Sequence, residues 1–122
     1  MQTEIIMKNI DTLSLNHNER MGLKGLVKEL TEKYSFIKTI MLYGSKARGN
    51  FLEESDIDLL FIADGNIPWS IKAEMSDIIY NYELANDIVV SAIFISESEF
   101  KNKVSLFLMK VRKEGVALWS RE

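Results

Sequence analysis

Apolar residues along the chain follow two spacings, one typical of helices and one typical of buried strands. Residues 19–34 and 70–84 carry apolar side chains at intervals of three and four, which predicts two amphipathic helices. Three short runs are almost continuously apolar and contain several β-branched residues: 37–43 (IKTIMLY), 57–63 (IDLLFIA) and 88–95 (IVVSAIFI). Runs of that length and composition are typical of strands inside a sheet. The chain is therefore predicted to alternate helices with strands.

The two ends of the chain complete this pattern. Residues 1–15 fit either a loose arm or a short strand. Residues 96–99 (SESE) resemble the start of a helix, and residues 104–113 predict a last helix that Gly115 ends. The predicted order is α-β-(turn or α)-β-α-β-α-α. It gives an α/β (α+β) fold, in which a small mixed β-sheet has helices packed mainly on one face.

Composition narrows the class of protein. The 122 residues, 47% hydrophobic and 27% charged, fit one soluble domain over residues 1–122. The absence of cysteine excludes disulfides, thiolate metal sites and cysteine nucleophiles. A net charge of −3 argues against a broad nucleic-acid-binding surface, so we expect no direct nucleic-acid binding. No apolar run approaches the roughly 20 residues that span a bilayer, and the N-terminal segment lacks the order of a secretory signal. We therefore expect a cytoplasmic protein that does not contact a membrane.

The first candidate site residues follow the strand predicted at residues 37–43. Gly44 and Ser45 end that strand and open a turn or short helix. Backbone N–H groups and the serine hydroxyl at such a turn suit a phosphate group, and the glycine lets the backbone approach it closely. Arg48 lies within reach and has the geometry to hold a phosphate through two hydrogen bonds. These three residues are candidates for phosphate binding.

A pair of carboxylates begins the next predicted strand. Asp56 and Asp58 are two positions apart, so the alternation of a strand places both on one face while Ile57 points the other way. Neighbouring carboxylates repel each other unless a cation lies between them. Mg²⁺, which prefers oxygen ligands and binds the phosphates of nucleoside triphosphates, is the expected occupant.

Each of these features alone is common in proteins without such a site, but their combination is specific. G-S-K-A-R-G at residues 44–49, followed by S-D-I-D-L-L at residues 55–60, resembles the signature of the DNA polymerase β-like nucleotidyltransferase superfamily. More narrowly, it is similar to the minimal nucleotidyltransferases, short stand-alone proteins often encoded beside a HEPN-domain partner. The resemblance implies the small nucleotidyltransferase core as the fold. It also implies that Gly44 and Ser45 hold the triphosphate and that Asp56 and Asp58 bind the metal.

The family also places a third carboxylate at the start of the following strand. Asp87 is the matching position, because it directly precedes the strand predicted from residue 88. The resemblance therefore implies that Asp87 joins Asp56 and Asp58 as a catalytic and metal-binding residue that helps to deprotonate an acceptor hydroxyl. The alternative is a solvated aspartate between a helix and a strand.

The resemblance implies an Mg²⁺-dependent transfer of a nucleotide, AMP from ATP, to a hydroxyl acceptor with release of pyrophosphate. Because the chain is short, we expect the acceptor site to come from a partner or from self-association. The family suggests a HEPN toxin as partner and an antitoxin role for this chain. Two alternatives remain open: a non-catalytic antitoxin that covers its partner, and a transferase acting on a small molecule.

Overall fold

The computed structural model describes residues 6–49 and 55–121 of the chain. Predictions that concern residues 1–5 and 50–54 lie outside this description. The elements are, in chain order, β1 (Ile6–Met7), the short 3-10 helix η1 (Ile10–Thr12), α1 (His17–Lys33), β2 (Ile37–Tyr43), α2 (Ser45–Arg48), β3 (Ile57–Ala63), α3 (Trp69–Asn86), β4 (Val90–Ser96), α4 (Glu97–Asn102), α5 (Leu106–Glu114) and β5 (Val116–Ser120).

The strands form one mixed sheet in the order β1-β5-β2-β3-β4. β2 is antiparallel to β3 and to β5, whereas β4 is parallel to β3 and β1 is parallel to β5. The three strands predicted from apolar runs, β2, β3 and β4, are neighbours in this sheet. The predicted mixed sheet is therefore confirmed.

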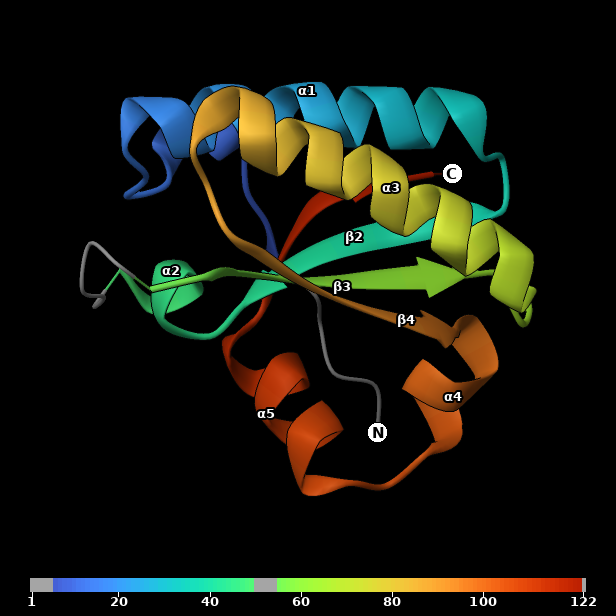
Figure 1. The fold of residues 1–122 in the computed structure, drawn as a ribbon. Helices are drawn as coiled ribbons and strands as arrows, with labels where there is room; N and C mark the ends of the chain where they lie inside the picture. The colour runs from blue at the N-terminus through green and yellow to red at the C-terminus, as the bar shows by residue number, and fades with distance from the viewer. Residues whose placement is uncertain (1–5, 50–54, 122) are drawn as a thin grey trace.

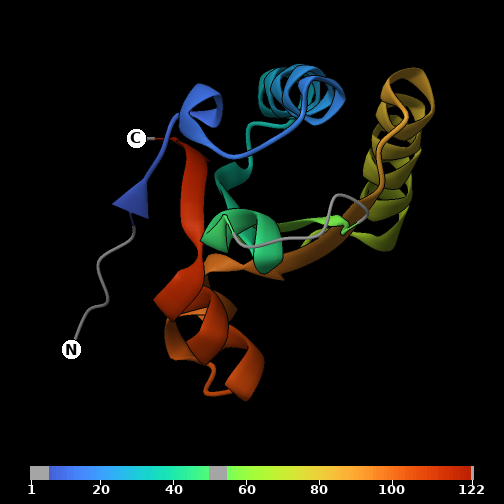
Figure 2. The same cartoon turned by 90° about the vertical axis from the view of Figure 1, so that its left-hand side faces the viewer.

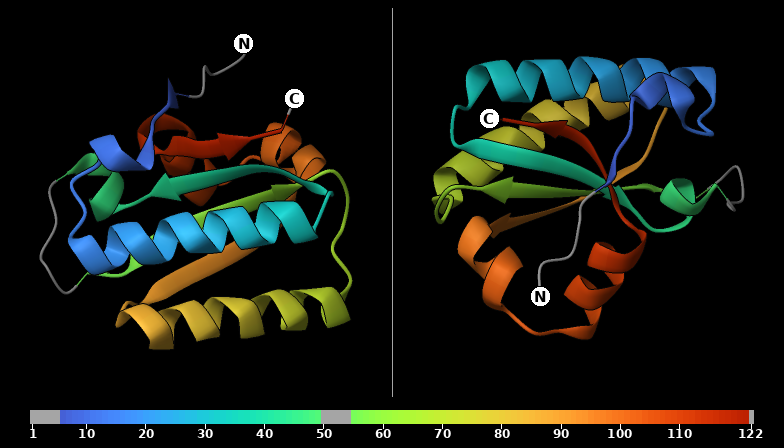
Figure 3. Two further views of the ribbon diagram at one scale, coloured as in Figure 1. Left: turned by 90° about the horizontal axis from the view of Figure 1, so that it is seen from above. Right: turned by 180° about the vertical axis from the view of Figure 1, so that it is seen from behind.

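Helices cover both faces of the sheet, but the two long ones share a face. α1 and α3 lie side by side across one face, as the view from above shows (Figure 3), and α4 and α5 lie against the other (Figures 1 and 2). The predicted placement of the two amphipathic helices is confirmed, and the short helices add a second, smaller apolar layer. Among the described residues, no helix combines the length and apolar character that a membrane span needs.

The inner strand β3 is buried on both sides, which explains its nearly continuous apolar sequence. Ile57, Leu59 and Phe61 belong to the core beneath α1 and α3. Leu60 and Ile62 belong to the smaller core that α4 and α5 cover. Side chains of a strand alternate between its faces, so Asp58 lies on the same face as Leu60, the face that α4 and α5 cover.

The first long helix begins at His17, two residues before the predicted start, because Asn16 caps it. The Asn16 side-chain oxygen accepts a hydrogen bond of 2.8 Å from the backbone N–H of Glu19. In return, the Asn16 backbone N–H donates to the Glu19 carboxylate at 3.1 Å. This reciprocal capping box satisfies N–H groups that the first helical turn leaves without partners. It also fixes the position of the Glu19 side chain, which is buried.

A strand that the sequence pattern did not predict follows Gly115. β5 inserts between β1 and β2, although the sequence predicted only that Gly115 ends the last helix. Arg121 holds the end of β5 in place, because its guanidinium donates to the backbone oxygens of Thr31 (2.8 Å) and Ile37 (3.0 Å). The five residues of β5 are too few to show a clear strand pattern. Its partners in the sheet are also distant in the sequence, so nothing near it along the chain indicates a strand.

Candidate active site at the ends of strands β2 and β3

The turn after β2 requires a glycine. Gly44 has φ +74° and ψ −157°, a conformation that residues with a side chain rarely adopt. Its carbonyl oxygen accepts hydrogen bonds from the N–H groups of Ala47 (3.1 Å) and Arg48 (3.2 Å), which closes the single turn of α2. A Cβ atom on Gly44 would overlap with the carboxylate of Asp58. The predicted phosphate turn is therefore a one-turn helix whose first glycine lies directly against an acid of the pair.

The structure brings the two acids of the D-I-D motif together at the start of β3. Asp56 is exposed and Asp58 is half-buried. Asp58 pairs with Tyr43 across the antiparallel β2–β3 ladder, which places it beside the Gly44 turn. Partial burial raises the pKa of Asp58 above its ordinary value, and the nearby charge of Asp56 raises it further. Two carboxylates in this arrangement are an oxygen donor set that suits a divalent cation, because a cation relieves their repulsion.

The raised pKa of Asp58 predicts a gain in stability when its charge is removed. A carboxyl whose pKa is raised by folding stabilises the folded state below its ordinary pKa, and this stability is lost as the pH rises through the raised value. At neutral pH the ionised carboxylate is therefore unfavourable in the protein without metal. We expect Asp58→Asn to raise the Tm at pH 7 without metal, as thermal unfolding monitored by circular dichroism would measure. The gain should shrink as the pH falls through the raised pKa and be gone below the ordinary value of 3.8, and an equal or lower Tm at pH 7 would contradict it.

Arg48, a predicted phosphate-binding residue, ends α2 close to the acid pair. Its guanidinium partly counteracts the rise in the pKa of Asp58. The Arg48 side chain is exposed, and its Nη1 donates a hydrogen bond of 2.9 Å to Glu114 at the end of α5. An exposed pair of this kind contributes little energy, so the guanidinium can exchange Glu114 for a phosphate at low cost. Ser45 is the first residue of α2 and is half-buried.

Lys46, which lies between the predicted phosphate-binding residues Ser45 and Arg48, makes a contact that the sequence analysis missed. Its side chain is fully buried, and its Nζ lies 2.5 Å from the Glu19 carboxylate at the start of α1. The N-x-x-E spacing of Asn16 and Glu19 is a capping-box pattern that could have marked Glu19 as a structurally fixed acid. No signal in the sequence pairs it with Lys46, because the two residues meet only when α2 packs beside α1.

The structure does not group Asp87 with Asp56 and Asp58 in an arrangement that could hold a metal ion. Asp87 ends α3 in the left-handed conformation, with φ 55°, and its side chain is exposed. β4 begins at Val90, and Ser91 is the residue that pairs with Asp58 across the parallel β3–β4 ladder. Within residues 6–49 and 55–121, no group of three or more Asp, Glu, His or Cys side chains is arranged to hold a metal ion. The sequence analysis placed the start of this strand at residue 88, which is too early, because residues 87–89 connect α3 to β4.

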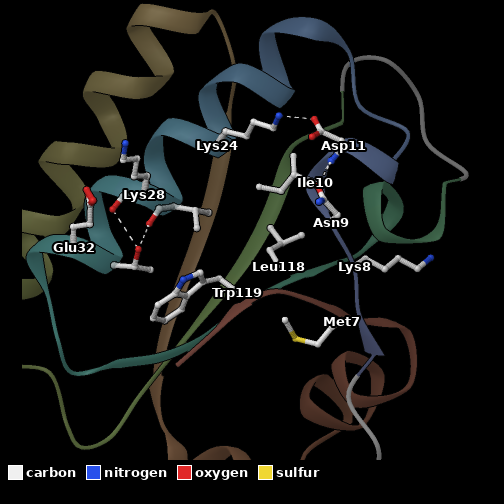
Figure 4. Close-up of a pocket in the computed structure, with 12 residues that line it drawn as sticks. Met7, Lys8, Asn9, Ile10, Asp11, Lys24, Lys28, Glu32, Leu118 and Trp119 are labelled. Atoms are coloured by element: carbon white, nitrogen blue, oxygen red, sulfur yellow. Dashed lines mark hydrogen bonds and ion pairs between the residues drawn. The ribbon is translucent and has the colours of Figure 1, made fainter. Parts of the chain in front are cut away.

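A groove of about 740 Å³ lies away from these residues, between α1 and the β1–β5 edge of the sheet (Figure 4). Lys24, Lys28 and Trp119 are among its lining residues, and Lys24 is paired with Asp11 at 2.5 Å. The groove contains none of Gly44, Ser45, Arg48, Asp56 and Asp58. We therefore assign the candidate active site to the end of β2 and the start of β3, where a glycine turn, a guanidinium and two carboxylates lie together, and not to this groove.

Comparisons with known proteins identify the family of the chain. Residues 26–122 match the family described as Polymerase beta, Nucleotidyltransferase. A predicted protein adenylyltransferase of Methanocaldococcus jannaschii is 38% identical over 104 residues, which cover 84% of this chain and 99% of the relative. The crystal structure of a predicted nucleotidyltransferase from Sulfolobus solfataricus is 28% identical, with a TM-score of 0.56 over 83% of this chain and 79% of that one.

A further likeness concerns the fold alone. A chain in the structure of the tri-AMPylated Shewanella oneidensis HEPN toxin in complex with MNT antitoxin is 17% identical to this chain. Its TM-score is 0.56, over 84% of this chain and 73% of that one. The match to the polymerase beta family covers residues 26–122, which include the glycine turn and the acid pair. This chain belongs to the polymerase beta nucleotidyltransferase family.

Proposed function

We propose that this chain transfers AMP from ATP to a hydroxyl group of a partner protein. The observation that carries the proposal is the contact between the Gly44 turn and Asp58, with Asp56 and Arg48 close by. The proposed site for the triphosphate and the proposed site for its metal would thus lie side by side. The Methanocaldococcus jannaschii relative, named as a protein adenylyltransferase, supports ATP as the donor and a protein as the acceptor.

The proposed roles follow from the charge and position of each residue. Gly44 and Ser45 hold the triphosphate through the backbone and the serine hydroxyl, and Arg48 leaves Glu114 to bind a phosphate oxygen. Asp56 and Asp58 would hold Mg²⁺ through their carboxylate oxygens. When bound, Mg²⁺ would neutralise the charge of the triphosphate and of the departing pyrophosphate.

The transfer itself is an in-line displacement at the α-phosphorus. An acceptor hydroxyl oxygen forms the new bond, its proton is lost to a base, and the bond to the β,γ-diphosphate breaks, so that pyrophosphate leaves. This chain orients the triphosphate for that attack. Asp87, assigned from the family pattern as a third catalytic acid, is left out of the proposed site because it ends α3 and is not grouped with the acid pair.

For the acceptor we propose a HEPN toxin, which this chain would inactivate as an antitoxin in the cytoplasm. The Shewanella oneidensis complex, in which an AMPylated HEPN toxin is bound to an MNT antitoxin, supports this choice. A non-catalytic antitoxin is the second candidate. It is favoured by one observation, that an uncharged Ser91 occupies the β4 position beside Asp58.

One labelling experiment separates the two candidates. The chain is incubated with Mg²⁺ and ATP labelled at either the α- or the γ-phosphorus, together with the protein encoded by the adjacent gene. We expect the α-label to become attached to the partner and the γ-label to remain in pyrophosphate. A partner that binds tightly and acquires neither label would support the non-catalytic candidate. Label without Mg²⁺ would contradict the proposed role of the acid pair.

A further inference from the structure

A buried ion pair joins the nucleotide turn to the first long helix. Lys46 Nζ lies 2.5 Å from Glu19 Oε2, and the two side chains are 0% and 6% exposed. The other oxygen of Glu19 accepts the hydrogen bond from the backbone N–H of Asn16. The carboxylate is therefore held from two sides, by the capping box of α1 and by Lys46.

Stability alone does not account for this pair. Removing two charges from water costs about as much as their attraction returns, so an apolar pair of similar volume is often equally stable or more so. What the pair does provide is a fixed geometry. A buried ammonium must meet a carboxylate of opposite charge, so such a pair favours one geometry, whereas an apolar side chain could settle in several.

The helix that carries Lys46 needs such an anchor. α2 has only one turn, and a single turn of helix is unstable without tertiary contacts. Among its other side chains, Ala47 packs partly against the apolar core, and Arg48 makes an exposed pair with Glu114. The exposed pair is weak in water, whereas the ion pair of Lys46 is shielded from water and, in the described part of the chain, joins α2 directly to the start of α1.

The position of α2 in turn determines the geometry of the site. Lys46 lies two residues after Gly44, which lies so close to Asp58 that an added Cβ would overlap with the Asp58 carboxylate. A shift of α2 would move the Gly44 turn relative to Asp58 and so separate the triphosphate position from the metal position. A displacement of about 1 Å is enough to weaken a bound transition state strongly.

We propose that Lys46 and Glu19 are positioning residues for nucleotide binding, which hold the Gly44–Ser45 turn against Asp58. The proposal rests on the proposed function of the site. It predicts that the fold tolerates the loss of both charges and that the nucleotide site does not.

The test is a double variant that removes both charges and preserves their volume, Lys46→Met/Glu19→Gln. Asp11→Asn/Lys24→Met is the matched control, because it removes an ion pair of the same length that lies in the groove of Figure 4, away from the acid pair. Three quantities are measured for each protein: the Tm, the Kd for a non-hydrolysable ATP analogue with Mg²⁺ by calorimetry, and amide hydrogen exchange. Hydrogen exchange is followed at the backbone N–H groups of Ala47 and Arg48, which donate to the carbonyl oxygen of Gly44.

For the double variant we expect a Tm within a few degrees of wild type, a Kd about tenfold higher or more, and exchange in α2 about tenfold faster or more. The control should match wild type in Kd and in α2 exchange. A purely structural pair would instead lower the Tm and speed exchange throughout the core.

Unchanged affinity in the double variant overturns the proposal. Failure of that variant to fold also overturns it, because the pair would then be required for the fold rather than for the site. If wild type itself binds no Mg²⁺–nucleotide, the proposed function fails. In that case amide hydrogen exchange in α2 still tests whether the ion pair holds the turn. Exchange rates in the double variant equal to those of wild type would overturn the positioning role too.

Discussion

Asp58→Asn is expected to lower the rate of nucleotide transfer by on the order of a thousandfold or more. Loss of a metal ligand from a phosphoryl-transfer site removes several kcal/mol of transition-state stabilisation, and each 1.4 kcal/mol corresponds to about tenfold in rate. Asparagine keeps the size of the side chain, so the Gly44 turn retains its neighbour. Transfer of α-labelled AMP to the partner, measured at saturating Mg²⁺, gives the rate. Asp56→Asn should act in the same direction, because Asp56 is the other acid of the pair.

Asp87→Asn is the matched control for this prediction, since it makes the same chemical change at an exposed helix end. We expect it to retain transfer within a fewfold of wild type. Melting with and without Mg²⁺–ATP provides a second readout: wild type and Asp87→Asn should gain stability from the ligand, and Asp56→Asn/Asp58→Asn should not. Wild-type transfer by that double variant would rule out a catalytic role for the acid pair. A loss in Asp87→Asn as large as in Asp58→Asn would instead restore Asp87 to the site.

Gly44→Ala is expected to damage both the nucleotide site and the fold. The backbone at φ +74° costs a residue with a side chain about 1–3 kcal/mol, and the added Cβ would overlap with the Asp58 carboxylate. The Asp58 side chain must then move away from the turn, or the turn must move away from β3. We expect a fall in Tm of roughly 5 °C or more. We also expect loss of measurable affinity for the Mg²⁺-bound ATP analogue.

Gly65→Ala is the control, because a Cβ at Gly65 meets no atom within 4 Å. It should leave both the Tm and the affinity close to wild type. The two readouts of Gly44→Ala also separate two roles for this glycine. A lower Tm with unchanged nucleotide affinity would mean that Gly44 serves only the backbone turn, and the assignment of the phosphate site to this turn would be wrong.

Much of the site follows from local sequence. The apolar run of residues 37–43 predicted β2, and the glycine after it predicted the turn that the structure has at Gly44. The alternation of Asp56, Ile57 and Asp58 predicted two acids together beside a buried isoleucine, and Ile57 is fully buried. These features are readable because strand periodicity and the conformational freedom of glycine act over a few residues, whatever the rest of the chain does.

Contacts between distant segments were decided by the tertiary structure. β5 exists because β1 and β2 offer it partners on either side, and Lys46 is buried because α1 presents Glu19 to it. The family pattern aligned Asp87 with the acid pair, but the left-handed turn that ends α3 delays β4, and the register then places Ser91 beside Asp58. Sequence spacing along one segment determines which of its residues share a face. Which residue of the next strand meets that face depends on where the intervening helix ends, and this is set by packing of the whole chain.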